Sequence, residues 1–208
     1  MALSAWLGAR MNKPNFTSVK SIGIRAVISF IIVIWSIHLQ AMQSEEKSPN
    51  IPLSTSSEAQ NWAVVNDTVM GGRSRAQISA GDTGLVFEGF LSLENNGGFA
   101  SVRRYKDPVS WIPGKTINIR VIGDGKLYQF RIRTDRALDG VAYAASFDTV
   151  NNTQTDISFA ETDFTPIWRG RKVRGAPQLS FADARQLGFM LTDKQAGEFT
   201  LSILAIEQ

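Results

Sequence analysis

Alternation of apolar and polar residues dominates the chain from about residue 85 onward. Runs in which every second residue is apolar predict β-strands with one buried face, and the clearest run places Leu85, Phe87 and Leu91 together. Similar runs lie near residues 117–121, 128–132, 141–147, 187–191 and 199–205, the last with Phe199, Leu201, Ile203 and Ala205 on one face. Clusters of Gly, Asn, Asp and Pro separate the runs.

These short strands predict an all-β fold of two packed sheets, a sandwich or a barrel. The only helical turn we expect lies near Phe181–Arg185, with Ser180 as its N-cap. The segment Gly89–Arg103 is typical of a strand, an Asn- and Gly-rich turn and a second strand, which predicts a β-hairpin.

The first 41 residues differ from the rest of the chain. They hold four basic residues and no acidic one, followed by the apolar run Ala26–Ile37, which is shorter than the ~20 residues that span a bilayer. This order is typical of a signal peptide cleaved near Ala41, or of a membrane anchor if the leader is retained. We therefore expect a secreted or periplasmic protein, with membrane contact only through an uncleaved leader. Residues 42–60, polar and rich in Ser and Pro, are expected to form a linker, and residues 61–208 the folded domain.

Charge and composition narrow the function classes. The formal net charge of +3 comes from the leader; without its four basic residues, 18 basic and 19 acidic residues remain, a net charge of −1. This balance argues against a nucleic-acid partner. The chain has no Cys, and its one His, His38, lies at the end of the apolar run, which removes thiolate metal sites and a Ser-His-Asp triad. We expect no metal, no cofactor and no catalytic residues.

Three loop-like segments are the candidate binding surfaces, because binding residues concentrate on loops held by a rigid scaffold. The first runs from residue 66 to 74 and is either a tight turn whose Asp or Asn bonds its own backbone, or a loop that contacts a ligand or partner. Its candidate residues are Asn66, Asp67, Met70, Gly71, Gly72 and Ser74.

The second segment is basic and adjoins a tryptophan. Its candidates, Trp168, Arg169, Gly170 and Arg171, fit either an anionic partner or a solvated loop. The third is the turn Asp193-Lys194. Arg131 is a further candidate, because Arg120, Arg131 and Arg133 occupy polar strand faces that either meet water or, on a concave sheet, line a groove.

Several motifs, in order, resemble the complex I intermediate-associated protein 30 family. They are N-D-x-x-M-G-G-x-S at 66–74, F-x-G-x-L at 87–91, G-G-F-A-S-x-R at 97–103, G-D-G-x-x-Y at 123–128, D-F-x-P-x-x-R-G-R at 163–171 and L-G-F-M-L-x-D-K-Q-x-G-x-F at 187–199. The resemblance implies a galactose-binding-like jelly-roll β-sandwich. It also implies a non-catalytic module, since the mitochondrial members are assembly factors for respiratory NADH:ubiquinone oxidoreductase.

Two functions remain open at this point. The first is a protein-binding, assembly-factor or chaperone-like role at a membrane-bound complex, which needs an apolar patch with a polar rim. The second is a carbohydrate-binding jelly-roll module in the periplasm, which needs exposed aromatic side chains. Trp111 and Trp168 are the aromatic candidates for a glycan, with Asn66, Asp67 and Arg131 as polar partners.

Overall fold

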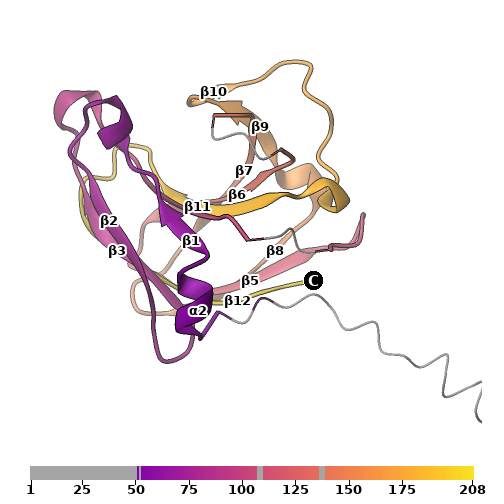
Figure 1. The fold of residues 1–208 in the computed structure, drawn as a ribbon, viewed down its shortest axis with the longest axis horizontal. Helices are drawn as coiled ribbons and strands as arrows, with labels where there is room; N and C mark the ends of the chain where they lie inside the picture. The colour runs from indigo at the N-terminus through magenta and orange to yellow at the C-terminus, as the bar shows by residue number, and fades with distance from the viewer. Residues whose placement is uncertain (1–50, 52, 107–109, 136–138) are drawn as a thin grey trace, which may run out of the picture. The chain divides into compact units, whose positions relative to one another are not determined.

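The structure is a computed structural model that describes residues 51, 53–106, 110–135 and 139–208 (Figure 1). The leader predicted for residues 1–41, with its cleavage site and its location in the cell, lies outside the described residues. Within the described part, no helix is long and apolar enough to cross a membrane.

Two antiparallel sheets form the fold, as the alternation predicted (Figure 1). The seven-stranded sheet has the order β1 (Trp62–Val64), β4 (Ala100–Arg104), β11 (Gln186–Leu191), β6 (Leu127–Arg133), β7 (Ala142–Asp148), β9 (Thr165–Trp168) and β10 (Arg171–Lys172). The five-stranded sheet has the order β2 (Arg75–Ala80), β3 (Leu85–Leu91), β12 (Gly197–Glu207), β5 (Ile117–Ile122) and β8 (Gln154–Phe159). The short helical elements are α2 (Ser56–Ala59), η1 (Asp67–Met70), η2 (Glu94–Asn96), η3 (Glu161–Asp163) and η4 (Phe181–Asp183).

The core lies between the sheets and is rich in phenylalanine. Phe87 on β3, Phe130 on β6 and Phe189 on β11 are all fully buried, and the rings of Phe130 and Phe189 lie 5.2 Å apart. Burying such rings supplies much of the stability of a sandwich. The predicted apolar face of β12 is wrong at its end, because a bulge between Ile203 and Ala205 turns Ile206, and not Ala205, into the core.

The predicted hairpin over Gly89–Arg103 is wrong. β3 pairs with β2 and β12 in one sheet, whereas β4 pairs with β1 and β11 in the other. The connection through η2 therefore carries the chain from sheet to sheet. Each strand finds its partners far away in the sequence, so a local turn signal does not determine the pairing.

The folded unit begins before Asn61. Ile51 and Leu53, from the segment expected to be a linker, are each 3% exposed and belong to the core. Glu58 on α2 is buried; its Oε1 accepts hydrogen bonds from Trp62 Nε1 at 3.0 Å and from Arg104 Nε at 2.6 Å. Burial alone raises the pKa of Glu58, but these hydrogen bonds outweigh it and lower the pKa. This buried ion pair fixes α2 to the edge of the seven-stranded sheet.

Candidate functional site

Asp67 is the centre of the first predicted loop. Its buried carboxylate accepts hydrogen bonds from the Ser74 backbone N–H at 2.9 Å, the Ser74 hydroxyl at 2.5 Å and the Gly98 N–H at 2.7 Å. A longer bond comes from the Phe99 N–H at 3.3 Å. Burial raises the pKa of Asp67, but these donors outweigh it and leave the pKa below its ordinary value. Asp67 thus joins its own loop to the connection that follows β3.

The other residues of this loop divide between the interior and solvent. Ser74 and Asn66 are buried, and a Cβ at Gly72 would lie 2.4 Å from the Asp67 side chain, so only glycine fits there. Met70 is 66% exposed, and Gly71 has a φ of +88°, which glycine adopts without strain. The geometry is that of the tight turn. Contact with a partner through Met70 and Gly71 stays a prediction.

The second predicted segment is a β-hairpin between β9 and β10. Arg169 and Gly170 form its two-residue turn, with φ of +47° and +74°. Trp168 is 45% exposed; its Nε1 donates to the Asp139 carbonyl at 2.9 Å. Arg169 Nε donates to the Asp139 carboxylate at 3.1 Å, and its guanidinium lies 4.9 Å from the centre of the Trp168 ring. One face of the ring is therefore covered by Arg169, while Arg171 remains exposed.

The exposure expected for Trp111 is wrong, and for Arg120 the structure excludes a groove shared with Arg131 and leaves the alternative in which the side chain meets water. Trp111 is 4% exposed and packs edge-to-face against Phe181 at 5.9 Å, because the apolar end of the sandwich needs a large side chain there. It is a core residue and offers no platform to a glycan. Arg120 lies on β5 in the five-stranded sheet, where it pairs with Asp156, so it shares no face with Arg131 on β6.

The third predicted segment is a turn between β11 and β12. Asp193 and Lys194 have φ of +62° and +59° and are exposed. Next to them, Gln195 accepts a hydrogen bond from the Leu127 N–H at 2.9 Å and donates one to the Leu127 carbonyl at 2.7 Å. Gln195 thus fixes the turn to β6, close to the strand that carries Arg131.

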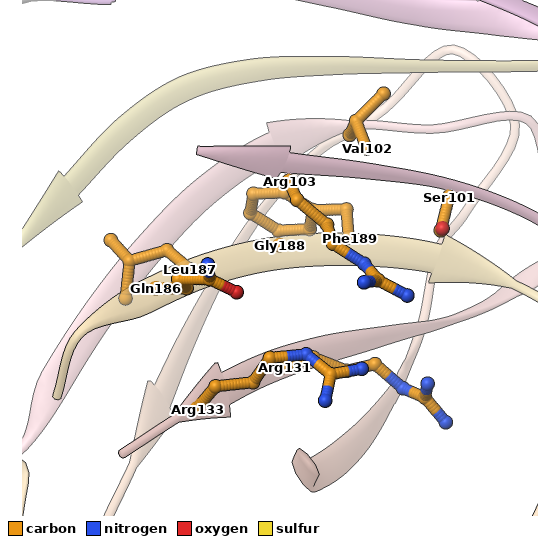
Figure 2. Close-up of a pocket in the computed structure, with 9 residues that line it drawn as sticks. All are labelled: Ser101, Val102, Arg103, Arg131, Arg133, Gln186, Leu187, Gly188 and Phe189. Atoms are coloured by element: carbon orange, nitrogen blue, oxygen red, sulfur yellow. The ribbon is translucent and has the colours of Figure 1, made fainter. Parts of the chain in front are cut away.

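A small pocket lies on the outer face of the seven-stranded sheet, away from the core (Figure 2). Gly188 on β11 is directly opposite Arg103 on β4 and Arg131 on β6, so the space that a side chain at 188 would fill lies between two arginines. One position along, Gln186 is opposite Arg133. Figure 2 shows the side chains of these polar residues around the pocket, on the neighbouring strands β4, β11 and β6.

The pocket is strongly positive. Burial, then the charges of Arg133 and Arg103, lower the pKa of Arg131 from its ordinary value to about 10. Burial and Arg103 likewise lower the pKa of Arg133. Arg131 Nε donates to Gln129 at 3.0 Å, and Arg133 donates to the Gly140 carbonyl. In the part of the chain that the structure describes, no carboxylate forms an ion pair with Arg131 or Arg133.

Gln186 is a pocket residue that the sequence reasoning missed. Its side chain is 6% exposed, and its Oε1 is buried without a hydrogen-bond partner. Buried amide oxygens almost always accept a hydrogen bond, so the pocket lacks a donor for this oxygen. The alternation of Gln186, Gly188 and Met190 with buried apolar residues on β11 was the available signal. Arg103 was missed too, although the family-like motif at 97–103 ends on it.

A second groove, of about 290 Å³, lies on the outer face of the five-stranded sheet around Gly89. Its polar side chains are of mixed charge, and Gln77 already donates to Glu88 at 2.7 Å. Among the described residues, no group of three or more His, Cys, Asp or Glu side chains is placed to hold a metal ion. The pocket on the seven-stranded sheet is therefore the candidate site, and its chemistry is the binding of an anion.

The fold is that of a galactose-binding-like jelly-roll β-sandwich, here with a cationic pocket on one open sheet face. The chain belongs to the complex I intermediate-associated protein 30 family, whose model matches residues 51–203. No match to a curated protein was found.

Two of the solved structures with a similar fold are carbohydrate-binding modules. The family 11 module from Clostridium thermocellum in complex with a β-1,3-1,4-mixed-linked tetrasaccharide is 15% identical, covering 70% of this chain and 88% of the module, with a TM-score of 0.51. The family 11 module of a cellulosomal cellulase of the same organism is also 15% identical, covering 71% and 86%, with a TM-score of 0.53. At this identity the likeness concerns the fold alone.

Proposed function

We propose that this protein is a non-catalytic protein-binding module of the assembly-factor type, and that its partner docks on the outer face of the seven-stranded sheet. The observation that carries the proposal is the cluster of Arg103, Arg131 and Arg133 on that face, in which two arginines lack an ion pair with any described carboxylate. Repulsion among like charges destabilises the folded protein, and negative charge on a bound acidic partner would offset that repulsion. Membership of the family supports the role of an assembly factor.

Carbohydrate binding is the second candidate function, and the family 11 modules support it through their fold. Stacking on a neutral sugar needs an aromatic ring with a free face. Of the two predicted aromatics, Trp111 is buried, and Trp168, which is 45% exposed, has Arg169 over one face of its ring. Only Trp168 is therefore left as a stacking platform, and the arginines on the outer face of the seven-stranded sheet favour an acidic partner over a neutral glycan.

We also propose that the protein works outside the cytoplasm, because residues 1–41 have the charge and apolar pattern of a leader. N-terminal sequencing of the protein isolated from its host tests this. A mature terminus near Met42 is expected; an intact N-terminus in the soluble cytoplasmic fraction would overturn it.

Site-specific crosslinking in the host tests the docking face. In the first variant, photoreactive p-benzoylphenylalanine replaces Ser146, which is exposed on β7 and has its side chain on the same sheet face as the pocket. In the matched control, it replaces Gln77, which lies on the outer face of the other sheet. We expect one defined protein to be crosslinked from position 146 and not from position 77. No crosslinked protein from 146, or equal crosslinking from both, would overturn the proposal. Retardation of the full chain in gels that contain mixed-linked β-glucan, together with the absence of a crosslink, would favour the carbohydrate-binding alternative.

A further inference from the structure

We propose that the pocket beside Gly188 holds one carboxylate of the partner, bound by Arg131 and Arg103, while Gln186 accepts a hydrogen bond from an N–H next to that carboxylate. The ligand is then an aspartate or glutamate residue in an exposed acidic segment of a protein. This inference rests on the proposed function and specifies what the docking face recognises.

The size of the pocket limits what enters it. Its cavity volume is about 10 Å³, which is the space that one water-sized group needs. A carboxylate oxygen is of this size and a pyranose ring is not. A Cβ at Gly188 would lie 2.5 Å from the Val102 carbonyl oxygen, so this position keeps its glycine for close packing, and the missing side chain leaves the opening between the arginines.

The charge of the pocket selects an anion, and the shape of its donors selects a planar one. A guanidinium presents parallel N–H donors that match the two oxygens of a carboxylate. Among the described carboxylates, Asp193, in the exposed turn after β11, raises the pKa of Arg131, but by less than burial, Arg133 or Arg103 each lowers it. The described carboxylates therefore leave the positive charge of Arg131 largely uncompensated.

Gln186 adds a requirement that a simple anion does not meet. Its buried Oε1 accepts no hydrogen bond from the residues that the structure describes and needs a donor from outside. An ionised sulfate has acceptors only, so binding it would leave this oxygen unsatisfied at a cost in free energy. An acidic residue in an extended peptide carries both parts, a side-chain carboxylate and the backbone N–H beside it. The arginines and Gln186 together fit that pair of groups.

An NMR titration of the full, ¹⁵N-labelled chain tests the pocket directly. The probe is the acetylated and amidated peptide Glu-Glu-Glu-Glu, with the corresponding Gln peptide as its neutral control. We expect the Glu peptide to shift the Gly188 amide and the Gln186 side-chain amide signals, and the Gln peptide to leave them in place. No shift at either position with the Glu peptide would overturn the proposal.

Two further probes separate the sources of the anion. Oligogalacturonate offers carboxylates on sugar rings, and sulfate offers a simple anion with no hydrogen-bond donor. Stronger binding of oligogalacturonate than of the Glu peptide would replace the protein partner by an acidic glycan. Equal binding of sulfate and peptide would overturn the role of Gln186 as an acceptor.

Variants at position 186 test the same point with little change of shape. Gln186→Glu places a carboxylate in the pocket, so peptide affinity is expected to fall at least about tenfold while the protein becomes no less stable. Gln186→Leu removes the acceptor and is expected to weaken binding of the peptide but not of sulfate. The control Arg120→Gln, on the other sheet, removes one positive charge and leaves peptide binding unchanged. If Arg120→Gln loses as much peptide affinity as Gln186→Glu, the loss is explained by net charge alone, and the proposal that the peptide binds in this pocket is overturned.

The peptide titration and the crosslinking can fail independently of each other. Peptide binding in the pocket without a crosslinked protein would retain the carboxylate site and reject the protein-binding function. A partner crosslinked from position 146 without peptide binding would retain the function and reject the pocket as its anchor.

Discussion

Replacing Arg131 with methionine is expected to make the protein more stable. The guanidinium lies partly buried beside Arg133 and Arg103, and no described carboxylate forms an ion pair with it. Methionine keeps the unbranched stem that packs on the sheet and removes the charge. The folded state then no longer bears the cost of holding three cations together.

The size of the gain follows from the pKa. The fall in the pKa of Arg131 from its ordinary value to about 10 corresponds to about 3 kcal/mol against the charged form, at about 1.4 kcal/mol for each pKa unit. The variant loses the hydrogen bond from Arg131 Nε to Gln129, which is worth about 1 kcal/mol. A net increase of about 2 kcal/mol in the free energy of unfolding remains, or a rise of roughly 4–8 °C in Tm for a folded unit of this size.

Urea unfolding of the full chain, followed by tryptophan fluorescence, measures this difference. Arg120→Met is the matched control, because Arg120 is exposed and paired with Asp156, and such pairs contribute only about 0–1 kcal/mol. Added NaCl is expected to stabilise the wild-type protein more than Arg131→Met, since salt screens the repulsion among the arginines. A loss of stability in Arg131→Met, with no difference in the response to salt, would refute the reasoning and make the cluster a structural feature.

Three further predictions concern the loops. Asp67→Asn is expected to lower the free energy of unfolding by at least about 2 kcal/mol, because a charged acceptor of several hydrogen bonds is lost, whereas Asp193→Asn in an exposed turn has little effect. The pKa of Asp67 is lower in the folded state than in the unfolded state. Its stabilising effect is therefore complete above the unfolded pKa of about 3.8 and is lost as the pH falls through the folded pKa. Measuring the free energy of unfolding against pH checks this, because the stability of Asp67→Asn is expected to depend less on acid than that of the wild type. Gly71→Val is expected to cost about 1–2 kcal/mol because its φ of +88° strains a β-branched residue, while Gly71→Asn folds nearly as well as wild type, as thermal unfolding will show. Arg169→Ala combined with Arg171→Ala is expected to weaken binding of the crosslinked partner and to leave Tm almost unchanged; a large fall in Tm would show that the hairpin is structural.

The fold was largely predictable because strand faces are a local property. Leu85, Phe87 and Leu91 alternate with polar residues, and the structure buries all three. Strand pairing is not local, and there the prediction of a hairpin between β3 and β4 was wrong. The carboxylate that fixes this connection, Asp67, lies far back in the sequence, so the Asn- and Gly-rich segment alone carried no information on which sheet β4 would join.

The candidate site was predictable only in part, for a related reason. Arg131 was singled out from the polar face of its own strand, but Gln186 was not, because a single glutamine in a strand carries no signal until its neighbours are known. The two come together only through the pairing of β6 with β11. Trp111 was misplaced because an isolated tryptophan in a loop-like segment is compatible with either a core or a surface position, and only its packing on Phe181 decides.

The outermost strands of the seven-stranded sheet limit how another molecule can associate with it. β1 has three residues and β10 two, and β10 ends the sheet with the exposed side chains of Arg171 and Lys172. Such short, charged edges offer few unpaired backbone groups to an incoming strand. The edges of the seven-stranded sheet are thereby poor templates for edge-to-edge pairing. A partner that docks on this sheet, as proposed, is then recognised by the side chains on its face, and substitutions there can change the partner without alteration of the backbone.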